Sequence, residues 1–233
     1  MRANLTEKIR EAVMAGEQEK AANAVSLCLE NGVDARDILM EILAIWEEVA
    51  EFYKRPDASE SQNNEFIKNV GRAYVPTYKI LFLLDKEIPA AVDPEGSVVV
   101  GCMRGEAHTL IKDIIALLLK KSGYHVVYKL GTGKDTPESI LESIKAANAD
   151  ALVLSVSRPE TLPLIEETVT ALRREGLREG VFVIMGGRAV DEEISRKLGC
   201  DLYEHRPLKA IEEVHRFINS KPKSNMLKNA SCG

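Results

Sequence analysis

Few features of this sequence suit a secreted, membrane-bound or zinc-ribbon protein. Its four cysteines lie far apart without a Cys-x-x-Cys pair, which excludes a zinc ribbon and is typical of reduced thiols in the cytoplasm. The longest apolar runs, such as 114–119, fall far short of the ~20 residues of a membrane helix. The N-terminal segment 1–7 lacks the apolar core of a signal peptide. These absences predict a cytoplasmic protein that does not bind a membrane.

An excess of basic residues is also missing. Lys and Arg total 31 against 36 Asp and Glu, which gives a formal net charge of −5. A protein that binds nucleic acid needs a basic surface to neutralise phosphates, so this balance argues against such a partner. Hydrophobic residues make up 45% and charged residues 29% of the 233 positions. That composition is typical of a globular protein with one large domain or two small ones.

Residues 1–88 show only helical patterns, which predict an N-terminal bundle of four or five helices. Asp34 is a good cap for the start of one of them. A later helical pattern covers 66–84 and is expected to be interrupted at Pro76. The apolar residues after Asp34 step by 4, 3, 4 and 3 and predict a packed seam of Ile38, Ile42, Ile45, Val49 and Phe52.

A linker is predicted over 89–95, where two prolines occur, and strand and helix patterns alternate after it. Five strand–helix units over 96–219 predict an α/β domain with a doubly wound, five-stranded parallel sheet, Rossmann-like or flavodoxin-like. The polar segment 220–233 is predicted to be a disordered tail. Strands are expected at 98–102, 125–130, 150–156, 181–185 and 201–203, and helices at 110–121, 161–174, 191–198 and 207–219, with one more that begins at Thr136.

Ligands of doubly wound sheets bind beyond the carboxyl ends of the strands, where the strand order reverses. For five strands the commonest order is 2-1-3-4-5, which places this point between strands one and three. The loops 103–109 and 155–161 follow those strands, and Gly186-Gly187 follows strand four. We therefore expect the three segments to converge on one edge of the sheet.

His108 is the histidine of that edge, and the residues leave three interpretations open. It is a loop histidine bonded to a backbone carbonyl, a general base oriented by Glu106, or a metal ligand whose tautomer Glu106 fixes. One imidazole is too few protein ligands for zinc. It is enough for a metal that arrives in a macrocycle with an open axial position.

The segment 96–115 (GSVVVGCMRGEAHTLIKDII) resembles the first strand, loop and helix of cobalamin-binding corrinoid proteins, whose pattern is Gly-Asp-x-His-x-x-Gly. The sequence around Ser155 resembles their Leu-Ser motif, and Met185-Gly186-Gly187 resembles their Gly-Gly motif. The helical half is more loosely similar to the bundle that precedes this domain in methyl-transferring corrinoid proteins and methionine synthase.

The resemblance implies cobalamin bound base-off and His-on. His108 would be the lower axial cobalt ligand, Glu106 would accept its other N–H, and Thr161 would complete a catalytic relay with these two residues. Ser155 would bond the displaced nucleotide tail, and Gly186 and Gly187 would leave room for it. The remaining implied cofactor-binding residues are Ala107, Thr109, Leu110, Ile111 and Ser157.

The chain also departs from the family pattern. Glu106 replaces Asp, Ile111 replaces the final Gly of the motif, and Thr109 replaces a frequent Asp. The longer arm of Glu106 keeps the charge but can alter the relay, and Ile111 is bulky where the chain of the family runs beside the tail. These departures keep a degenerate, non-binding domain as an alternative.

The function implied is a corrinoid methyl carrier, a carrier subunit of an O- or N-demethylase type of methyltransferase system and not a complete enzyme. A partner methyltransferase would pass a methyl group from a methylated substrate to Co(I), and a second would move it to tetrahydrofolate or a thiol. A reductive activator is a further implied partner. The alternative from another class is a cobalamin-dependent sensor or antirepressor.

Two other features support weaker predictions. The segment 131–136 (GTGKDT) lacks the upstream glycine of a phosphate loop and is interpreted as a plain loop. Trp46 lies on an apolar helix and is expected in the core. If the bundle caps the upper face of cobalt, Trp46, Phe52, Tyr53 or Tyr74 would cover it.

Overall fold

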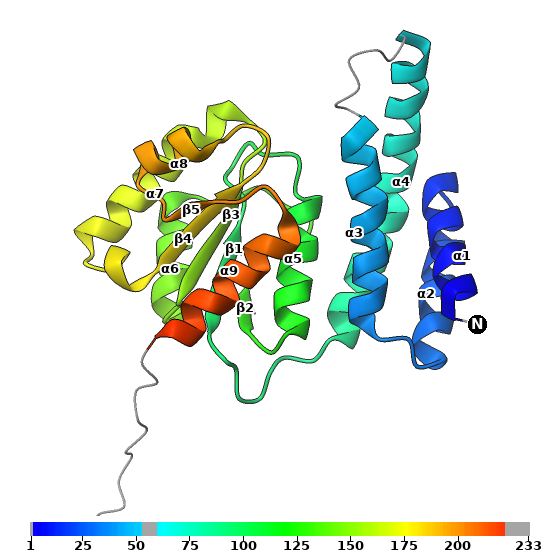
Figure 1. The fold of residues 1–233 in the computed structure, drawn as a ribbon, viewed down its shortest axis with the longest axis horizontal. Helices are drawn as coiled ribbons and strands as arrows, with labels where there is room; N and C mark the ends of the chain where they lie inside the picture. The colour runs from blue at the N-terminus through cyan, green and yellow to red at the C-terminus, as the bar shows by residue number, and fades with distance from the viewer. Residues whose placement is uncertain (1, 53–59, 222–233) are drawn as a thin grey trace, which may run out of the picture.

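The computed structural model describes residues 2–52 and 60–221, and it consists of a helical bundle beside an α/β domain (Figure 1). The cap predicted at Asp34 is confirmed, since its Oδ1 accepts a hydrogen bond from the Arg36 amide at 2.8 Å. Residues 53–59, which include Tyr53, lie outside the described part. The helices of the bundle are α1 (Arg2–Ala15), α2 (Gln18–Glu30), α3 (Ala35–Phe52) and α4 (Glu60–Glu87).

The interruption predicted at Pro76 is wrong, because α4 continues through this residue. A proline inside a helix removes one hydrogen bond and costs about 3 kcal/mol. Apolar residues on both sides of Pro76 are fully buried, and each leucine or isoleucine among them contributes roughly 1.5–3 kcal/mol through burial. Burial therefore outweighs the cost of the proline. These residues are Ala73, Ile80, Leu81 and Leu84.

The sheet has the predicted order, β2-β1-β3-β4-β5, and every strand pair is parallel. Strand two is shorter than expected and ends at Val127. The chain turns away there because the Lys129 carbonyl accepts a hydrogen bond from the buried Lys112 ammonium at 2.6 Å. The strands are β1 (Ser97–Gly101), β2 (His125–Val127), β3 (Ala151–Ser155), β4 (Phe182–Gly186) and β5 (Leu202–Tyr203).

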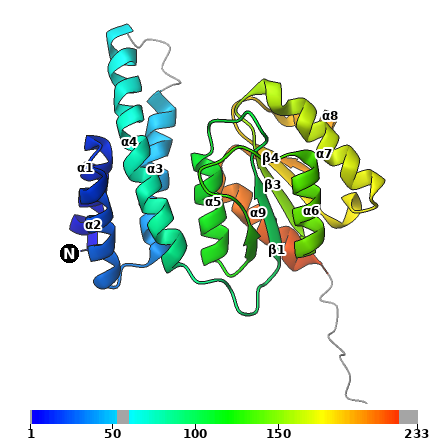
Figure 2. The same ribbon diagram turned by 180° about the vertical axis from the view of Figure 1, so that it is seen from behind.

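Helices cover both faces of the sheet, as Figure 2 shows from behind. Alternate residues of β1 point to opposite faces: Val98 and Val100 pack with α5 and α9, and Val99 packs with α6 and α7. The helix predicted from residue 161 begins at Leu162, after a 3-10 turn at Pro159–Thr161. The last helix, α9, includes Ser220, which was predicted to be the first residue of the tail. Residues 222–233 lie outside the described part. The helices are α5 (Leu110–Lys121), α6 (Pro137–Ala147), α7 (Leu162–Arg174), α8 (Glu192–Leu198) and α9 (Pro207–Ser220).

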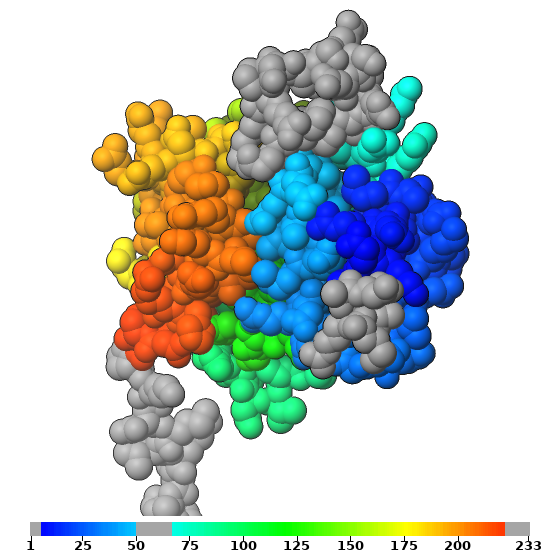
Figure 3. All heavy atoms as spheres, turned by 45° about the vertical axis from the view of Figure 1, so that its right-hand side comes forward, coloured from blue at the N-terminus to red at the C-terminus, as the bar shows by residue number. Residues whose placement is uncertain are grey.

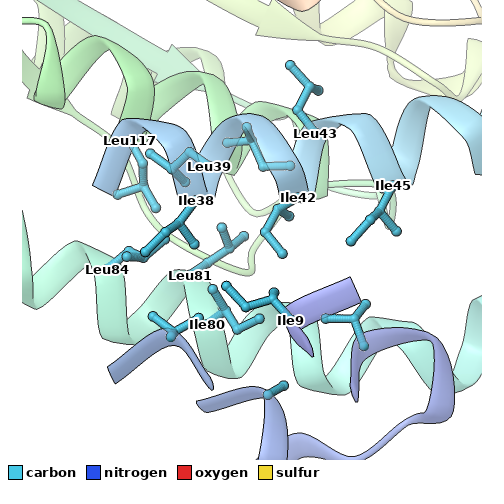
Figure 4. Packing of buried hydrophobic residues seen from close by; sticks show 14 of the residues in the cluster. Ile9, Ile38, Leu39, Ile42, Leu43, Ile45, Ile80, Leu81, Leu84 and Leu117 are labelled. Atoms are coloured by element: carbon cyan, nitrogen blue, oxygen red, sulfur yellow. The ribbon is translucent and has the colours of Figure 1, made fainter. Parts of the chain in front are cut away.

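Helix α5 belongs to both hydrophobic cores. Leu117 packs with the bundle, whereas Ile115 and Leu119 pack with the sheet and α9. Figure 4 shows Leu117 beside Leu39 of α3. The predicted seam of α3 is buried at Ile38, Ile42, Ile45 and Val49, and the side chain of Phe52 is outside the described part. Helix α3 has a second buried face of Leu39, Leu43 and Trp46.

The bundle lies against one side of the α/β domain. Figure 3 shows α9 next to α3, and Leu208 and Ile211 of α9 pack against the core of the bundle. The boundaries proposed at 88 and 95 stay predictions. In the described part of the chain, no helix is long and apolar enough to cross a membrane.

Candidate functional site

The loops after β1 and β3 are joined by the carboxylate of Glu106. Its Oε1 accepts a hydrogen bond from the His108 amide at 2.9 Å, and its Oε2 accepts one from the Ser157 amide at 2.7 Å. The Glu106 side chain is fully buried. The two predicted segments therefore do meet at the switch point of the sheet.

The ring of His108 has a different partner on each nitrogen. Nδ1 lies 2.9 Å from Glu106 Oε1, and Nε2 lies 3.2 Å from Arg188 Nη2. An ionised carboxylate can only accept a hydrogen bond and a guanidinium can only donate one. Both contacts therefore select the neutral tautomer with its proton on Nδ1 and its lone pair on Nε2. The side chain is 54% exposed, and its Nε2 lone pair points to the exposed Arg188 side chain.

Hydrogen-bond donors around Glu106 keep its carboxylate ionised. Burial raises the pKa of this carboxyl, but the amides of His108 and Ser157 and the His108 ring lower it by more. The pKa therefore lies below its ordinary value, and Glu106 is ionised at neutral pH. A buried carboxylate held by two backbone amides is a fixed acceptor, which suits a group that must orient an imidazole.

The loop 131–136 supports this arrangement, although the sequence indicated only a plain loop. A Cβ on Gly133 would overlap the carbonyl oxygen of Glu106, so glycine is required for this close approach. Asp135 Oδ2 accepts a hydrogen bond from the Cys102 amide at 3.0 Å. The pair of glycines at 131 and 133 was the available signal for such a packing role.

The relay predicted through Thr161 is not formed in this structure. The Thr161 hydroxyl donates to the Arg158 carbonyl at 2.8 Å, within the 3-10 turn that precedes α7. Its methyl group is the part that faces Gly105. A local turn hydrogen bond therefore occupies the hydroxyl, and the catalytic role of Thr161 stays a prediction.

Gly186 and Gly187 are needed because the backbone of neighbouring segments approaches them closely. A Cβ on Gly187 would overlap the backbone of Val156, and its φ of +123° is a conformation that favours glycine. A Cβ on Gly186 would overlap the carbonyl oxygen of Glu204. Ser155 pairs with Gly186 in the β3–β4 register and is half-buried. The glycine pair is therefore explained by strand packing before any ligand is considered.

The residues on either side of His108 face the bundle. The Ala107 carbonyl accepts a hydrogen bond from the Tyr74 hydroxyl at 3.4 Å, and Thr109 Oγ1 lies 2.5 Å from the Tyr78 hydroxyl. Thr109 and Leu110 are buried there, and the partly buried Ile111 packs against the cores on both sides of α5. Ala107 and Thr109 thus connect the His108 loop to α4, and Leu110 and Ile111 pack in the hydrophobic core that α5 shares with the bundle.

The role of Tyr78 was missed, although the spacing of Tyr74 and Tyr78 on one helix face was a visible signal. Trp46 is buried as predicted, and its indole N–H donates to Thr77 Oγ1 at 3.1 Å. The Tyr74 ring lies edge-on to Trp46, with 5.8 Å between the ring centroids. The aromatic residues of the bundle therefore reach the loop that carries His108.

The donor set fits a metal that already has most of its ligands. Within residues 2–52 and 60–221, no group of three or more His, Cys, Asp or Glu side chains could hold a metal ion. Cys102 is buried, its Sγ donates to the Ser155 carbonyl at 3.4 Å, and burial raises the pKa of its thiol to about 12. One imidazole whose tautomer leaves the lone pair on Nε2 fits the axial position of a metal macrocycle.

Comparisons with known proteins agree with this chemistry. Residues 96–211 match the family described as "B12 binding domain". The chain is 28% identical over 142 residues to dimethylamine corrinoid protein 2 of Methanosarcina acetivorans, covering 60% of this chain and 64% of that protein. It is 30% identical over 133 residues to dimethylamine corrinoid protein 3 of Methanosarcina mazei, covering 54% of this chain and 78% of that one.

A solved structure has the same overall fold. The monomethylamine corrinoid protein of Methanosarcina barkeri superposes with a TM-score of 0.60 at 19% identity, covering 93% of this chain and 99% of that one. The predicted architecture, a helical bundle followed by a Rossmann-like domain, is confirmed. The chain spans less than two thirds of the first dimethylamine relative that it matches.

Proposed function

This chain belongs to the family of corrinoid proteins that carry a B12-binding domain, and from this premise we propose that it is a corrinoid methyl carrier. One observation carries the proposal. A half-exposed imidazole at the switch point of the sheet has its Nδ1 proton fixed by a buried carboxylate and its Nε2 lone pair turned outward. This is the arrangement that a base-off, His-on cobalamin requires of its protein ligand.

Each residue of the site has a role in the proposed function. His108 holds the metal through Nε2, and Glu106 keeps the ring oriented and the proton on Nδ1. The amide of Ser157 keeps the Glu106 carboxylate in place and ionised. When bound, the corrinoid supplies a cobalt centre that can accept and give up a methyl group. Ser155 and the Gly186-Gly187 pair would be the residues beside the cofactor's nucleotide tail.

The carrier function requires partners. We propose one methyltransferase that delivers the methyl group from a methylated substrate and a second that moves it to tetrahydrofolate or a thiol. A reductive activator restores the cofactor after oxidation. The relatives named after dimethylamine support methylated amines as the first class of donor to test.

The decisive experiment identifies the nitrogen bound to cobalt. Protein labelled with nitrogen-15 is mixed anaerobically with unlabelled hydroxocobalamin, desalted, reduced to Co(II) and examined by EPR. A nitrogen-15 ligand from the protein splits each line into a doublet, whereas the cofactor's own base gives a triplet. We expect the doublet in the wild-type protein and its loss in His108→Ala.

The matched control is His205→Ala, which removes a histidine of similar exposure, 61% against 54%, near the end of β5. We expect this variant to keep the doublet. A triplet in the wild-type protein would refute His-on binding. Failure to retain any corrinoid would leave the degenerate domain, and retention without methyl transfer between partner enzymes would favour the sensor.

A further inference from the structure

Arg188 occupies the atom through which His108 would bind a metal. Its Nη2 lies 3.2 Å from His108 Nε2, and the two residues are 80 positions apart in the chain. A guanidinium donates hydrogen bonds and cannot accept them, so the contact uses the lone pair of Nε2. That lone pair can serve Arg188 or a metal ion, but not both at once.

The backbone that carries Arg188 is fixed, whereas its side chain is free to move. Gly187, the preceding residue, packs directly on the backbone of Val156. The amide of Ala189, the following residue, donates to the Val156 carbonyl at 3.2 Å. The Arg188 side chain is exposed and can reach other rotamers in solvent. The guanidinium can therefore leave His108 by rotation about side-chain bonds, without a change in the sheet.

We propose that Arg188 is a positioning residue that covers His108 Nε2 in the cofactor-free chain and must leave before the corrinoid metal can bind. It holds the ring in the tautomer that a metal needs, with a cation at the place of the metal, and it competes with the metal for the same lone pair. This inference rests on the proposed function of His108 as the axial ligand.

Competition between Arg188 and the metal for Nε2 predicts that the corrinoid binds more tightly when the Arg188 guanidinium is removed. A solvent-accessible hydrogen bond contributes about 0.5–1.5 kcal/mol, so its loss corresponds to about a twofold to tenfold gain in affinity. Glu106 remains in the variant and continues to fix Nδ1. The gain from lost competition is therefore not cancelled by loss of the correct tautomer.

The first test uses the cofactor-free protein and a reagent for free imidazole nitrogen. Diethyl pyrocarbonate acylates an unprotonated ring nitrogen, and peptide mass spectrometry gives a rate for each histidine. We expect Arg188→Leu to raise the rate at His108 about twofold to tenfold relative to His205 in the same sample. Arg188→Lys, which keeps a cationic donor on a shorter side chain, is expected to give an intermediate rate.

The matched control is Arg196→Leu, which removes an exposed arginine from α8 and changes the net charge equally. We expect it to leave the His108 to His205 rate ratio unchanged. The inference is overturned if Arg188→Leu also leaves this ratio unchanged, or if the control raises it as much. Circular dichroism and thermal melting of each variant verify that the fold is retained.

The second test is the affinity for hydroxocobalamin, measured by absorbance titration of the same variants. We expect Arg188→Leu to bind about twofold to tenfold more tightly than the wild-type protein, and Arg196→Leu to match it. Equal or weaker binding by Arg188→Leu contradicts the competition. If no variant binds cobalamin, the proposed function fails, whereas the reagent experiment still decides whether Arg188 covers His108.

Discussion

Two clusters near the N-terminal end of α5 each pair a carboxylate with a nitrogen group. The open cluster contains Glu106 and His108, and the closed cluster contains Asp113 and Lys112. Only the open cluster is exposed to solvent. In the first, Glu106 is buried but its partner His108 is 54% exposed. In the second, the Lys112 ammonium lies 2.6 Å from Asp113 Oδ1, with side-chain exposures of 1% and 0%. The clusters are only a few residues apart in the chain.

The closed cluster is held by hydrogen bonds from several elements. Asp113 Oδ2 accepts hydrogen bonds from the Tyr78 hydroxyl at 2.9 Å and from the Gly131 amide at 2.9 Å. Lys112 donates to the Lys129 carbonyl at 2.6 Å. Burial raises the pKa of Asp113 and outweighs the opposing effect of Lys112. This cluster joins the bundle, α5 and the loop after β2, and it has no open position for a ligand.

The comparison shows which property distinguishes the functional cluster from the structural one. Both clusters contain a fully buried carboxylate beside a nitrogen group, so this feature does not separate structure from function. The open cluster combines one fixed partner, Glu106, with one replaceable partner, Arg188. His108 is the candidate ligand because Glu106 fixes its tautomer and its Nε2 lone pair contacts only a replaceable, exposed side chain, that of Arg188.

The largest expected effect is on the closed cluster. Lys112→Met leaves the Asp113 carboxylate buried without its cation, and breaking one partner of a buried pair costs about 3–5 kcal/mol. We expect this loss in the free energy of unfolding, measured by urea denaturation. The control Lys20→Met removes a lysine from an exposed pair with Glu17 and should cost less than about 1 kcal/mol. Similar losses in both variants would show that the closed cluster is not structural.

The open cluster should respond in binding more than in stability. Glu106→Gln replaces a fixed carboxylate by an amide, and loss of such a supporting group weakens metal binding about 10–100-fold. We expect this drop in cobalamin affinity by absorbance titration, with a smaller loss of stability than in Lys112→Met. An unchanged affinity would remove Glu106 from the site.

The connection between the clusters can be weakened at Tyr78. Tyr78→Phe removes the hydrogen bonds to Asp113 and Thr109, and a bond to a charged group contributes about 1.5–3 kcal/mol. We expect a loss of this size in urea denaturation. Tyr74→Phe is the comparison variant, since its hydroxyl contacts the Ala107 carbonyl at 3.4 Å and the neutral Tyr78 hydroxyl, and its loss should cost about 1 kcal/mol. Equal losses would contradict a special role for Tyr78.

Acid should also destabilise the protein by protonating the carboxylate of Glu204, which follows β5. The Arg206 guanidinium lowers the pKa of Glu204 to about 2, although burial opposes this shift. Because the folded pKa lies below the unfolded value of about 4.3, this contribution is complete above that value and is lost as the pH falls towards 2. Urea denaturation between these values should show a shallower acid dependence for Glu204→Gln than for the wild-type protein. An identical slope would remove Glu204 as a cause.

The smallest effect is expected at Thr161. Its hydroxyl is bonded to Arg158 and not to Glu106, so Thr161→Val should change cobalamin affinity by less than about twofold and stability by about 1 kcal/mol. Absorbance titrations of Thr161→Val and Glu106→Gln with cobalamin compare the affinities of the two variants. A loss as large as that of Glu106→Gln would restore Thr161 to the relay.

Much of the fold was determined by local sequence. Helix caps such as Asp34 and Thr136 act within a few residues, and the apolar strand runs require a sheet covered on both faces. The order of five parallel strands followed from the commonest doubly wound topology and was confirmed. The same topology located His108 and Glu106 at the switch point, where the structure places them.

Other properties were decided only by tertiary structure. Helix α4 continues through Pro76 because distant apolar residues bury both of its flanks. The contact of Arg188 with His108 joins positions 80 apart, and that of Tyr78 with Asp113 joins positions 35 apart. Local patterns depend on neighbours within one or two turns, and therefore can be predicted from the sequence. The partner of each polar side chain depends on which loops the packed sheet and bundle bring together, and the sequence alone does not specify it.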